Sequence, residues 1–176
     1  VWYIAGQPAI SGPGAILYKG DGDPVDTKAE DGTITSRSGK ITVDGGKTLR
    51  APISGLTLYW ADINFVQSKY TISPITSMSV VGEHNGWNEK EAPALTPSAD
   101  LKKWTGTMQL GGAFKINCNH AWDLDFGGTS IPDVMAGQHQ YNLTFKGGNL
   151  NVDETATYDV TVDFGVYPYV LTLVKK

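Results

Sequence analysis

Two tryptophans give this chain its clearest candidates for ligand chemistry. Trp87 follows Asn85-Gly86, which is a turn signal, and Trp122 lies in a stretch rich in Gly and Asp, so neither occupies a regular inward-facing strand position. We expect both indoles to be partly exposed. An exposed indole can stack on the apolar C–H face of a pyranose, while ammonium and amide groups bond the hydroxyls at its rim.

The polar partners of these indoles come from the segment 113–119. Alternate side chains of a strand face opposite ways, so Phe114 and its even-numbered neighbours are predicted to be core and the odd-numbered residues to form a polar row. The same alternation places Trp104 and Cys118 in the core. The candidate ligand-binding residues are therefore Trp87, Trp122, Lys115, Asn117 and Asn119. A structural interpretation, in which Trp87 caps the end of a sandwich and Trp122 pins a loop, fits the spacing equally well.

Catalysis has weaker support in the sequence. The candidates are His84, His120 and His139 together with Glu83, Asp123 and Asp125. No His-Glu-x-x-His spacing fixes a metal geometry, and no Gly-x-Ser-x-Gly elbow occurs. Asp123 and Asp125 would share one face of an extended strand, whereas a glycosidase needs two carboxylates opposed across a cleft. We predict a protein that is not an enzyme, with no catalytic residue, no metal and no cofactor.

Acidic residues between Gly20 and Asp26 resemble the start of a calcium loop. Such a loop needs Asp at alternate positions, a Gly at the sixth and a Glu at the twelfth. Here Pro24 stands in the middle and no Glu follows at the required position. A solvated turn is the expected structure.

The order of motifs in the second half resembles a known family. Val80-Val81-Gly82 leads into Asn85-Gly86-Trp87, a strand with Trp104 follows, then Phe114-Lys115-Ile116-Asn117, and finally Trp122-Asp-x-Asp-Phe-Gly-Gly. This series resembles the starch-binding modules of the SusE/SusF-type surface lipoproteins of Bacteroidetes, over about the last hundred residues.

The resemblance implies roles and a location. Trp87 and Trp122 match the stacking pair of such modules, and Lys115 matches their hydroxyl-binding lysine; Asn117 and Asn119 are added because they share the face of Lys115. It implies binding of polysaccharide or oligosaccharide, with α-glucans favoured. It also implies a place at the cell surface, on the outer membrane, through a lipid anchor outside this fragment, with other outer-membrane components of glycan uptake as partners.

Composition limits the other partners. The formal net charge is -4 and the Lys and Arg residues are scattered, which argues against a nucleic-acid partner. No hydrophobic run approaches the roughly 20 residues of a membrane helix, so no transmembrane segment is expected in this fragment. The 21 Gly and 9 Pro, with many Thr, Val and Tyr, predict an all-β chain of short strands with little helix. Short strands are expected at 1–6, 15–18, 33–38 and 40–44, and two further strands, 103–110 and 113–119, on the two sides of Gly111-Gly112.

A repeat divides the chain. Residues 59–65 and 70–72 align without gaps on 158–164 and 169–171, with matching faces. We therefore predict two tandem immunoglobulin-like β-sandwich modules: 1–74, a shortened spacer, and 75–176, the carbohydrate-binding module. The main alternative is a pair of structural or protein-interaction modules without glycan binding. Because the chain begins at Val1, inside an expected strand, we expect a processed or truncated piece of a longer protein.

Overall fold

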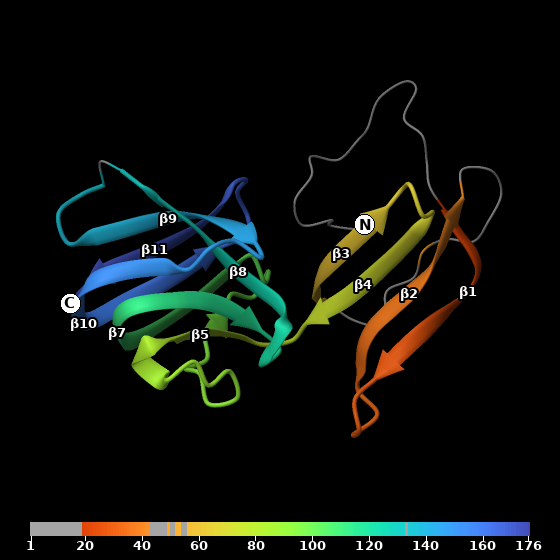
Figure 1. The fold of residues 1–176 in the computed structure, drawn as a ribbon, viewed down its shortest axis with the longest axis horizontal. Coiled ribbons are helices and arrows are strands. Elements are labelled where there is room, and N and C mark those ends of the chain that lie inside the picture. Colours follow the sequence, from red (N-terminus) through yellow and green to blue (C-terminus); the bar gives the residue numbers. More distant parts are fainter. Residues whose placement is uncertain (1–18, 43–48, 50–51, 54–55, 133) are drawn as a thin grey trace. The chain divides into compact units, whose positions relative to one another are not determined.

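The computed structural model describes residues 19–42, 49, 52–53, 56–132 and 134–176, whose regular secondary structure is β-strand apart from one short 3₁₀ turn (Figure 1). The prediction of an all-β chain with little helix is confirmed. The chain divides into two compact units, Val1–Ile75 and Thr76–Lys176, one residue from the boundary expected between 74 and 75. The immunoglobulin-like form of the modules stays a prediction, and the strands expected at 1–6 and 15–18 lie outside the described residues.

The described residues of the first unit form an antiparallel sheet in the order β1-β2-β4-β3. Its strands are β1 (Lys19–Lys28), β2 (Ile34–Thr42), β3 (Leu58–Asn64) and β4 (Lys69–Ile75). Ile41, Tyr70 and Ile72 form a small buried cluster, against which alternate residues of β3 pack. Arg37 and Asp26 join β2 to β1 through an ion pair of 2.6 Å.

Two expectations for this unit are wrong. The segments 33–38 and 40–44 were expected as separate strands, yet one strand, β2, runs through Gly39. The segment Gly20–Asp26 was expected as a solvated turn and instead belongs to β1, with a register shift between Asp21 and Val25. A β-bulge explains the mistake, because it carries Gly and Pro inside a paired strand.

In the second unit the strands form a hydrogen-bonded circuit. Its elements are β5 (Met78–Gly82), the 3₁₀ turn η1 (Glu83–Asn85), β6 (Thr96–Pro97), β7 (Lys103–Cys118), β8 (Ala121–Ile131), β9 (Gln138–Phe145), β10 (Leu150–Asp163) and β11 (Tyr169–Lys175). The order β10-β11-β9-β8-β7 is closed by pairing of β7 with β10, and β5 and β6 add to β7. Every strand of the circuit therefore has neighbours on both sides.

The long strand β7 organises this unit. The sequence suggested two strands around Gly111-Gly112, but one strand continues through them. It pairs with β10 over Lys103–Phe114 and with β5 over Phe114–Cys118, so the partner changes at Phe114. Gly111 is required because a Cβ at this position would lie 2.2 Å from Thr155 Oγ1, where β10 bulges.

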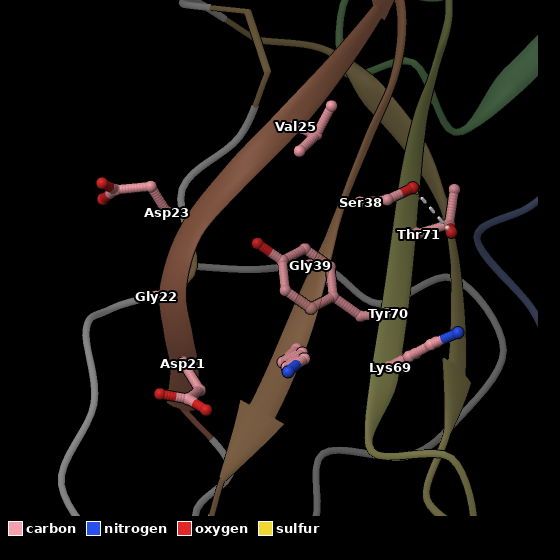
Figure 2. Close-up of a pocket in the computed structure, with 10 residues that line it drawn as sticks. Asp21, Gly22, Asp23, Val25, Ser38, Gly39, Lys69, Tyr70 and Thr71 are labelled. Carbon is pink, nitrogen blue, oxygen red and sulfur yellow. Dashed lines mark hydrogen bonds between the residues drawn. The ribbon is translucent and has the colours of Figure 1, made fainter.

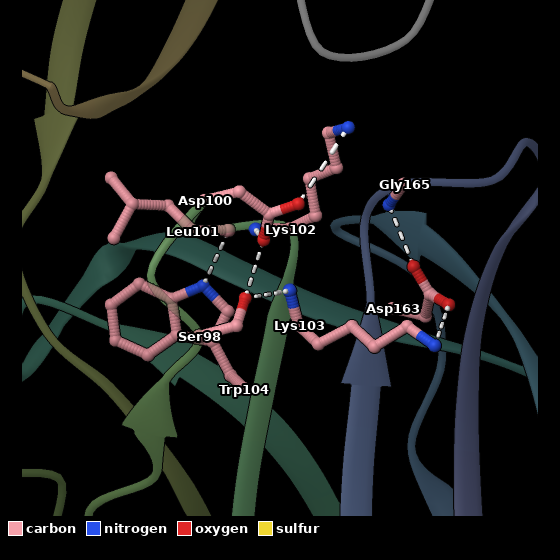
Figure 3. Close-up of polar contacts among 8 residues, drawn as sticks. All are labelled: Ser98, Asp100, Leu101, Lys102, Lys103, Trp104, Asp163 and Gly165. Atoms are coloured by element: carbon pink, nitrogen blue, oxygen red, sulfur yellow. Dashed lines mark hydrogen bonds and ion pairs between the residues drawn. The ribbon is translucent and has the colours of Figure 1, made fainter.

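The predicted inward face of β7 is confirmed by burial. Trp104, Leu110, Phe114, Ile116 and Cys118 are all buried. The indole N–H of Trp104 donates to the Leu101 carbonyl at 3.1 Å, inside a turn fixed by Ser98 and Asp100 (Figure 3). Trp104 is therefore a structural tryptophan.

The repeated hairpin occurs in both units with different pairing. β3–β4 and β10–β11 are both antiparallel hairpins, but Ile63 pairs with Tyr70, whereas its counterpart Val162 pairs with Leu171. The hairpin end differs as well: Phe65 is exposed, while Phe164 packs against Tyr169 at 4.8 Å between ring centroids. Matching faces in the sequence thus predicted the hairpins but not their register.

The free cysteine gives a direct check of the core. Cys118 is fully buried, and this burial, with the nearby Asp125 carboxylate, raises the pKa of its thiol to about 12. Because the thiolate is the reactive form, we expect no reaction with a disulfide reagent at pH 8 until the protein unfolds. Titration with Ellman's reagent, with and without denaturant, measures this, and fast labelling of the native chain would contradict the placement.

Candidate functional site

The structure brings the two predicted indoles together. Trp87 and Trp122, 35 positions apart in the sequence, have ring centroids 6.3 Å apart and planes inclined by 37°. Trp122 is 39% exposed and Trp87 is half-buried. We call this pair of tilted, partly exposed rings the tryptophan platform.

The Asn-Gly-Trp motif builds the first half of this platform. Asn85 Oδ1 accepts from the Gly82 N–H at 3.0 Å, and Asn85 Nδ2 donates to the Asn88 carbonyl at 2.9 Å, so one side chain ties both ends of the turn. Gly86 and Trp87 both have positive φ, of 64° and 60°. A left-handed Trp is uncommon, and here its N–H closes the turn by donating to the Gly82 carbonyl at 2.9 Å.

A bulge in β8 presents the second indole. Cys118 pairs with Ala121 across a two-residue turn, but Asn117 pairs with Asp125, so residues 122–124 have no partner on β7. The turn residues Asn119 and His120 have φ of 58° and 51°, as a tight hairpin of this kind requires. A bulge redirects side chains, and this one leaves Trp122 exposed at the surface.

A histidine connects the two halves. His120 Nδ1 lies 2.7 Å from the Glu89 carbonyl oxygen, which joins the β7–β8 turn to the loop after Trp87. His84 Nε2 contacts the Val80 carbonyl at 3.2 Å, and its burial lowers its pKa. His139 lies elsewhere, against Tyr158. In the part of the chain that the structure describes, no three His, Cys, Asp and Glu residues are placed to hold a metal ion.

A buried carboxylate directly follows the bulge that carries Trp122. Asp125 is almost fully buried, and its two oxygens accept separate hydrogen bonds of 2.6 Å from Lys115 Nζ and Lys146 Nζ. Burial alone would raise the pKa of Asp125, but the hydrogen bonds and charges of the two lysines outweigh it and lower the pKa below its ordinary value. The carboxylate is therefore ionised at neutral pH and holds both ammonium groups.

Lys146 also contacts the backbone of one platform residue. Its ammonium donates to the backbone carbonyl of Trp122 and lies 5.8 Å from the centroid of the Phe145 ring. Lys146 was not among the predicted site residues. No local sequence signal marked it: the turn Lys146-Gly147-Gly148 meets Gly127 and Gly128 of β8 only in the folded chain.

The predicted asparagines lie differently from expectation. Asn117 is fully buried and donates to the Ala121 carbonyl at 2.7 Å, so its predicted position on an open polar row is wrong. The β8 bulge explains this burial, because Asn117 pairs with Asp125 on one side of the bulge and its side chain bonds Ala121 on the other. Asn119 leaves the strand for the turn, and its Oδ1 accepts from Thr76 N at 2.9 Å and Ser77 N at 3.3 Å. Both amides stabilise the hairpin that carries Trp122.

Glycines permit the close approach of the Lys146 turn. A Cβ on Gly127 would lie 1.8 Å from the Gly148 carbonyl oxygen, and Gly128 N donates to that same oxygen at 2.9 Å. The Lys146 N–H donates to the Asp125 carbonyl at 2.9 Å. The turn after β9 therefore packs directly on β8, next to the platform.

We expect Gly127→Ala to displace this turn. The clash is with backbone atoms, which cannot rotate away, so the variant should lose stability by about 1–3 kcal/mol and weaken the contact between Lys146 and Trp122. Urea unfolding measures the first effect. Gly137→Ala is a suitable control for crowding, because nothing lies within 4 Å of its added Cβ, although its φ of 77° adds some strain. Equal stability of Gly127→Ala and the natural chain would contradict the close packing.

A hollow of about 600 Å³ lies on the first unit (Figure 2). Figure 2 shows the Tyr70 ring lying across Gly39, and a Cβ on Gly39 would come within 2.8 Å of that ring. Tyr70 is buried, so it offers no ring face for stacking. The hollow results from the bulge of β1 beside Gly39. Unlike the tryptophan platform, it offers no exposed face of an aromatic ring.

Comparisons of this chain with protein-family models, with curated proteins and with solved structures found no match. In the described residues, no helix is long and apolar enough to cross a membrane.

Proposed function

We propose that the second unit binds a polysaccharide without chemical turnover, with starch or another α-glucan as the favoured class. The observation that supports this best is the Trp87–Trp122 pair, with its 6.3 Å separation and 37° tilt. Flat, parallel rings suit a straight chain, whereas tilted rings follow a curved one. The α-1,4 linkage gives glucans such curvature.

The affinity expected of such a site for a glycan is modest. By analogy with stacking of nucleobases on aromatic side chains, each indole contributes about 1–3 kcal/mol. Sugar hydroxyls lose good hydrogen bonds to water when they bind, so the polar contacts add little net free energy. Several modules on one surface would raise the overall affinity through avidity.

The proposed setting is the bacterial cell surface. The resemblance to surface lipoproteins supports a lipid anchor outside this fragment and association with other glycan-uptake components of the outer membrane. In this arrangement the first unit acts as a spacer that holds the binding module away from its anchor.

Native electrophoresis of the 176-residue chain through gels containing amylopectin, pullulan, dextran, xylan or pectin tests the function. Retardation by amylopectin and pullulan, relative to a gel without polysaccharide and to serum albumin in the same gel, is expected. Retardation by xylan or pectin alone would contradict the α-glucan class. Normal mobility in every gel would contradict glycan binding and favour the spacer interpretation.

A further inference from the structure

We propose that Lys146, and not Lys115, supplies the ammonium group that contacts the bound glycan beside the tryptophan platform. This inference rests on the proposed function of the platform. It differs from the role that the sequence resemblance assigns to Lys115, and it depends on where the two lysines lie relative to Asp125 and Trp122.

Hydrogen bonds fix both the backbone of Lys146 and the ammonium group at the end of its side chain. Its backbone N–H donates to the Asp125 carbonyl at 2.9 Å, and its Nζ bonds Asp125 Oδ2 at 2.6 Å. The same Nζ donates to the carbonyl of Trp122, one of the two platform residues. The ammonium is therefore held at the backbone of the residue on which a sugar ring would stack.

Lys146 also keeps capacity for a ligand. An ammonium group has three donors, and the two bonds to Asp125 and Trp122 leave one for an incoming hydroxyl. The Lys146 side chain is 47% exposed, so a hydroxyl can reach it without a rearrangement of the chain. A pre-positioned donor loses less conformational entropy on binding than a free surface lysine.

Lys115 lies in a different environment. Its side chain is 17% exposed, and its Nζ is bonded to Asp125 Oδ1, on the strand face that also carries the buried Asn117. We assign Lys115 the role of a positioning residue. It fixes the carboxylate of Asp125, which in turn fixes Lys146.

This arrangement also bears on the kind of sugar. The two ammonium groups and the one carboxylate of the Asp125 cluster leave that cluster with one net positive charge. The free donor of Lys146 suits a hydroxyl at the edge of a neutral glucose ring. A uronic acid would also be attracted, but its binding would weaken strongly with salt, whereas binding of a neutral glucan should not.

The test measures affinity and platform geometry together. Maltoheptaose is titrated calorimetrically into the 176-residue chain and into the variants Lys146→Met, Lys146→Arg and Lys115→Met, with Lys102→Met as the matched control. Lys102 carries the same charge and is exposed, and it pairs with Asp100 in a turn away from the platform. Circular dichroism near 230 nm follows the platform, because two indoles 6.3 Å apart give a coupled signal.

We expect Lys146→Met to lower the affinity about tenfold while the coupled signal of the indoles is kept, as for loss of one hydrogen bond from a charged donor. Lys146→Arg should retain most of the affinity, and Lys102→Met all of it. Lys115→Met should lower the affinity only in proportion to its effect on the coupled signal of the two indoles, because Lys115 acts by positioning other groups.

Each of the other outcomes contradicts either this inference alone or the proposed function as well. Normal affinity of Lys146→Met overturns the inference and leaves the proposed function intact. Loss of affinity together with loss of the coupled signal reduces Lys146 to a positioning residue, which also overturns it. Failure of the natural chain to bind maltoheptaose overturns the α-glucan proposal and this inference with it.

Discussion

Replacement of Trp122 by alanine is expected to abolish retention of the chain in polysaccharide gels. Trp122 offers the more exposed ring of the pair, and its removal also takes away the 6.3 Å contact that orients Trp87. Loss of one stacking contact, worth about 1–3 kcal/mol, lowers a weak affinity by roughly ten- to hundredfold. Mobility in an amylopectin gel should then equal mobility in a gel without polysaccharide.

Trp87→Ala is expected to give the same loss of binding with a larger effect on stability. Its indole is half-buried, and its backbone is held by a hydrogen bond of 2.9 Å from its N–H to the Gly82 carbonyl. Trp122 lies in a bulge, so Trp122→Ala should change the free energy of unfolding by less than about 1 kcal/mol. Trp122→Ala therefore separates binding from folding more cleanly.

Trp104→Phe provides the matched control for these tryptophan variants. Trp104 is buried in β7 and serves the core, so its replacement should lower stability and leave retention unchanged. Normal retention of both Trp87→Ala and Trp122→Ala would show that the platform is not the binding site. Loss of retention in Trp104→Phe at a temperature where it is folded would contradict the same assignment.

The elements that the sequence predicted best are those governed by local periodicity. Alternation along β7 sorted Trp104 and Phe114 to the core, because side chains of a strand alternate regardless of which strand lies beside it. Asn85-Gly86 likewise marked a turn, since Gly tolerates the positive φ found there. In both cases the information lies within a few residues.

The features that were missed depend on contacts between distant segments. Nothing near Asn117 in the sequence shows that residues 122–124 bulge across from it, so an odd-numbered strand position was taken as open. Gly111-Gly112 resembled a strand break, because the bulge of β10 that requires a glycine comes some 40 residues later. The sequence supplied the residue types, and the pairing decided their exposure.

The residues of the site likewise divide into those marked by local motifs and those brought in by distant contacts. Trp87, Trp122 and Lys115 belong to motifs that are visible in the chain; the structure places Trp87 against Trp122 and pairs Lys115 with Asp125, which follows the β8 bulge. Lys146 comes from a separate turn, which reaches Asp125 only because Gly127 has no side chain. Its participation could be seen only once β8 and β9 were paired.

Replacement of Asp125 by asparagine is expected to cause the largest loss of stability of the variants considered. The change leaves the ammonium groups of Lys115 and Lys146 without their shared partner, and Lys115 is mostly buried. Breaking a buried ion pair from one side costs about 3–5 kcal/mol, and the partial exposure of Lys146 moves the expected value toward the lower end. Urea unfolding of the natural chain and of Asp125→Asn measures the difference.

Two further variants test the cause of that loss. Asp159→Asn removes an exposed carboxylate that pairs with Lys176 at 3.2 Å and accepts a hydrogen bond from Thr107. The amide oxygen of Asn can still accept from Thr107, so the effect should stay within about 0.5 kcal/mol. Adding Lys115→Met to Asp125→Asn should restore part of the stability, because the uncompensated charge is removed. If the double variant is as unstable as the sum of the single changes, the two residues are not coupled.

Acid titration gives the same interaction an independent readout. Lys115 and Lys146 lower the pKa of Asp125 in the folded protein against the opposing effect of burial, so the unfolded chain binds the proton more readily. The stabilisation is therefore complete above about pH 4, the ordinary pKa of an aspartate, and is lost as the pH falls through the lower, folded-state pKa. The natural chain should lose its greater stability relative to Asp125→Asn across this acidic range. The difference between their free energies of unfolding at each pH measures this. A difference that stays constant from pH 7 down to pH 2 would mean that the carboxylate does not hold the two lysines as the structure shows.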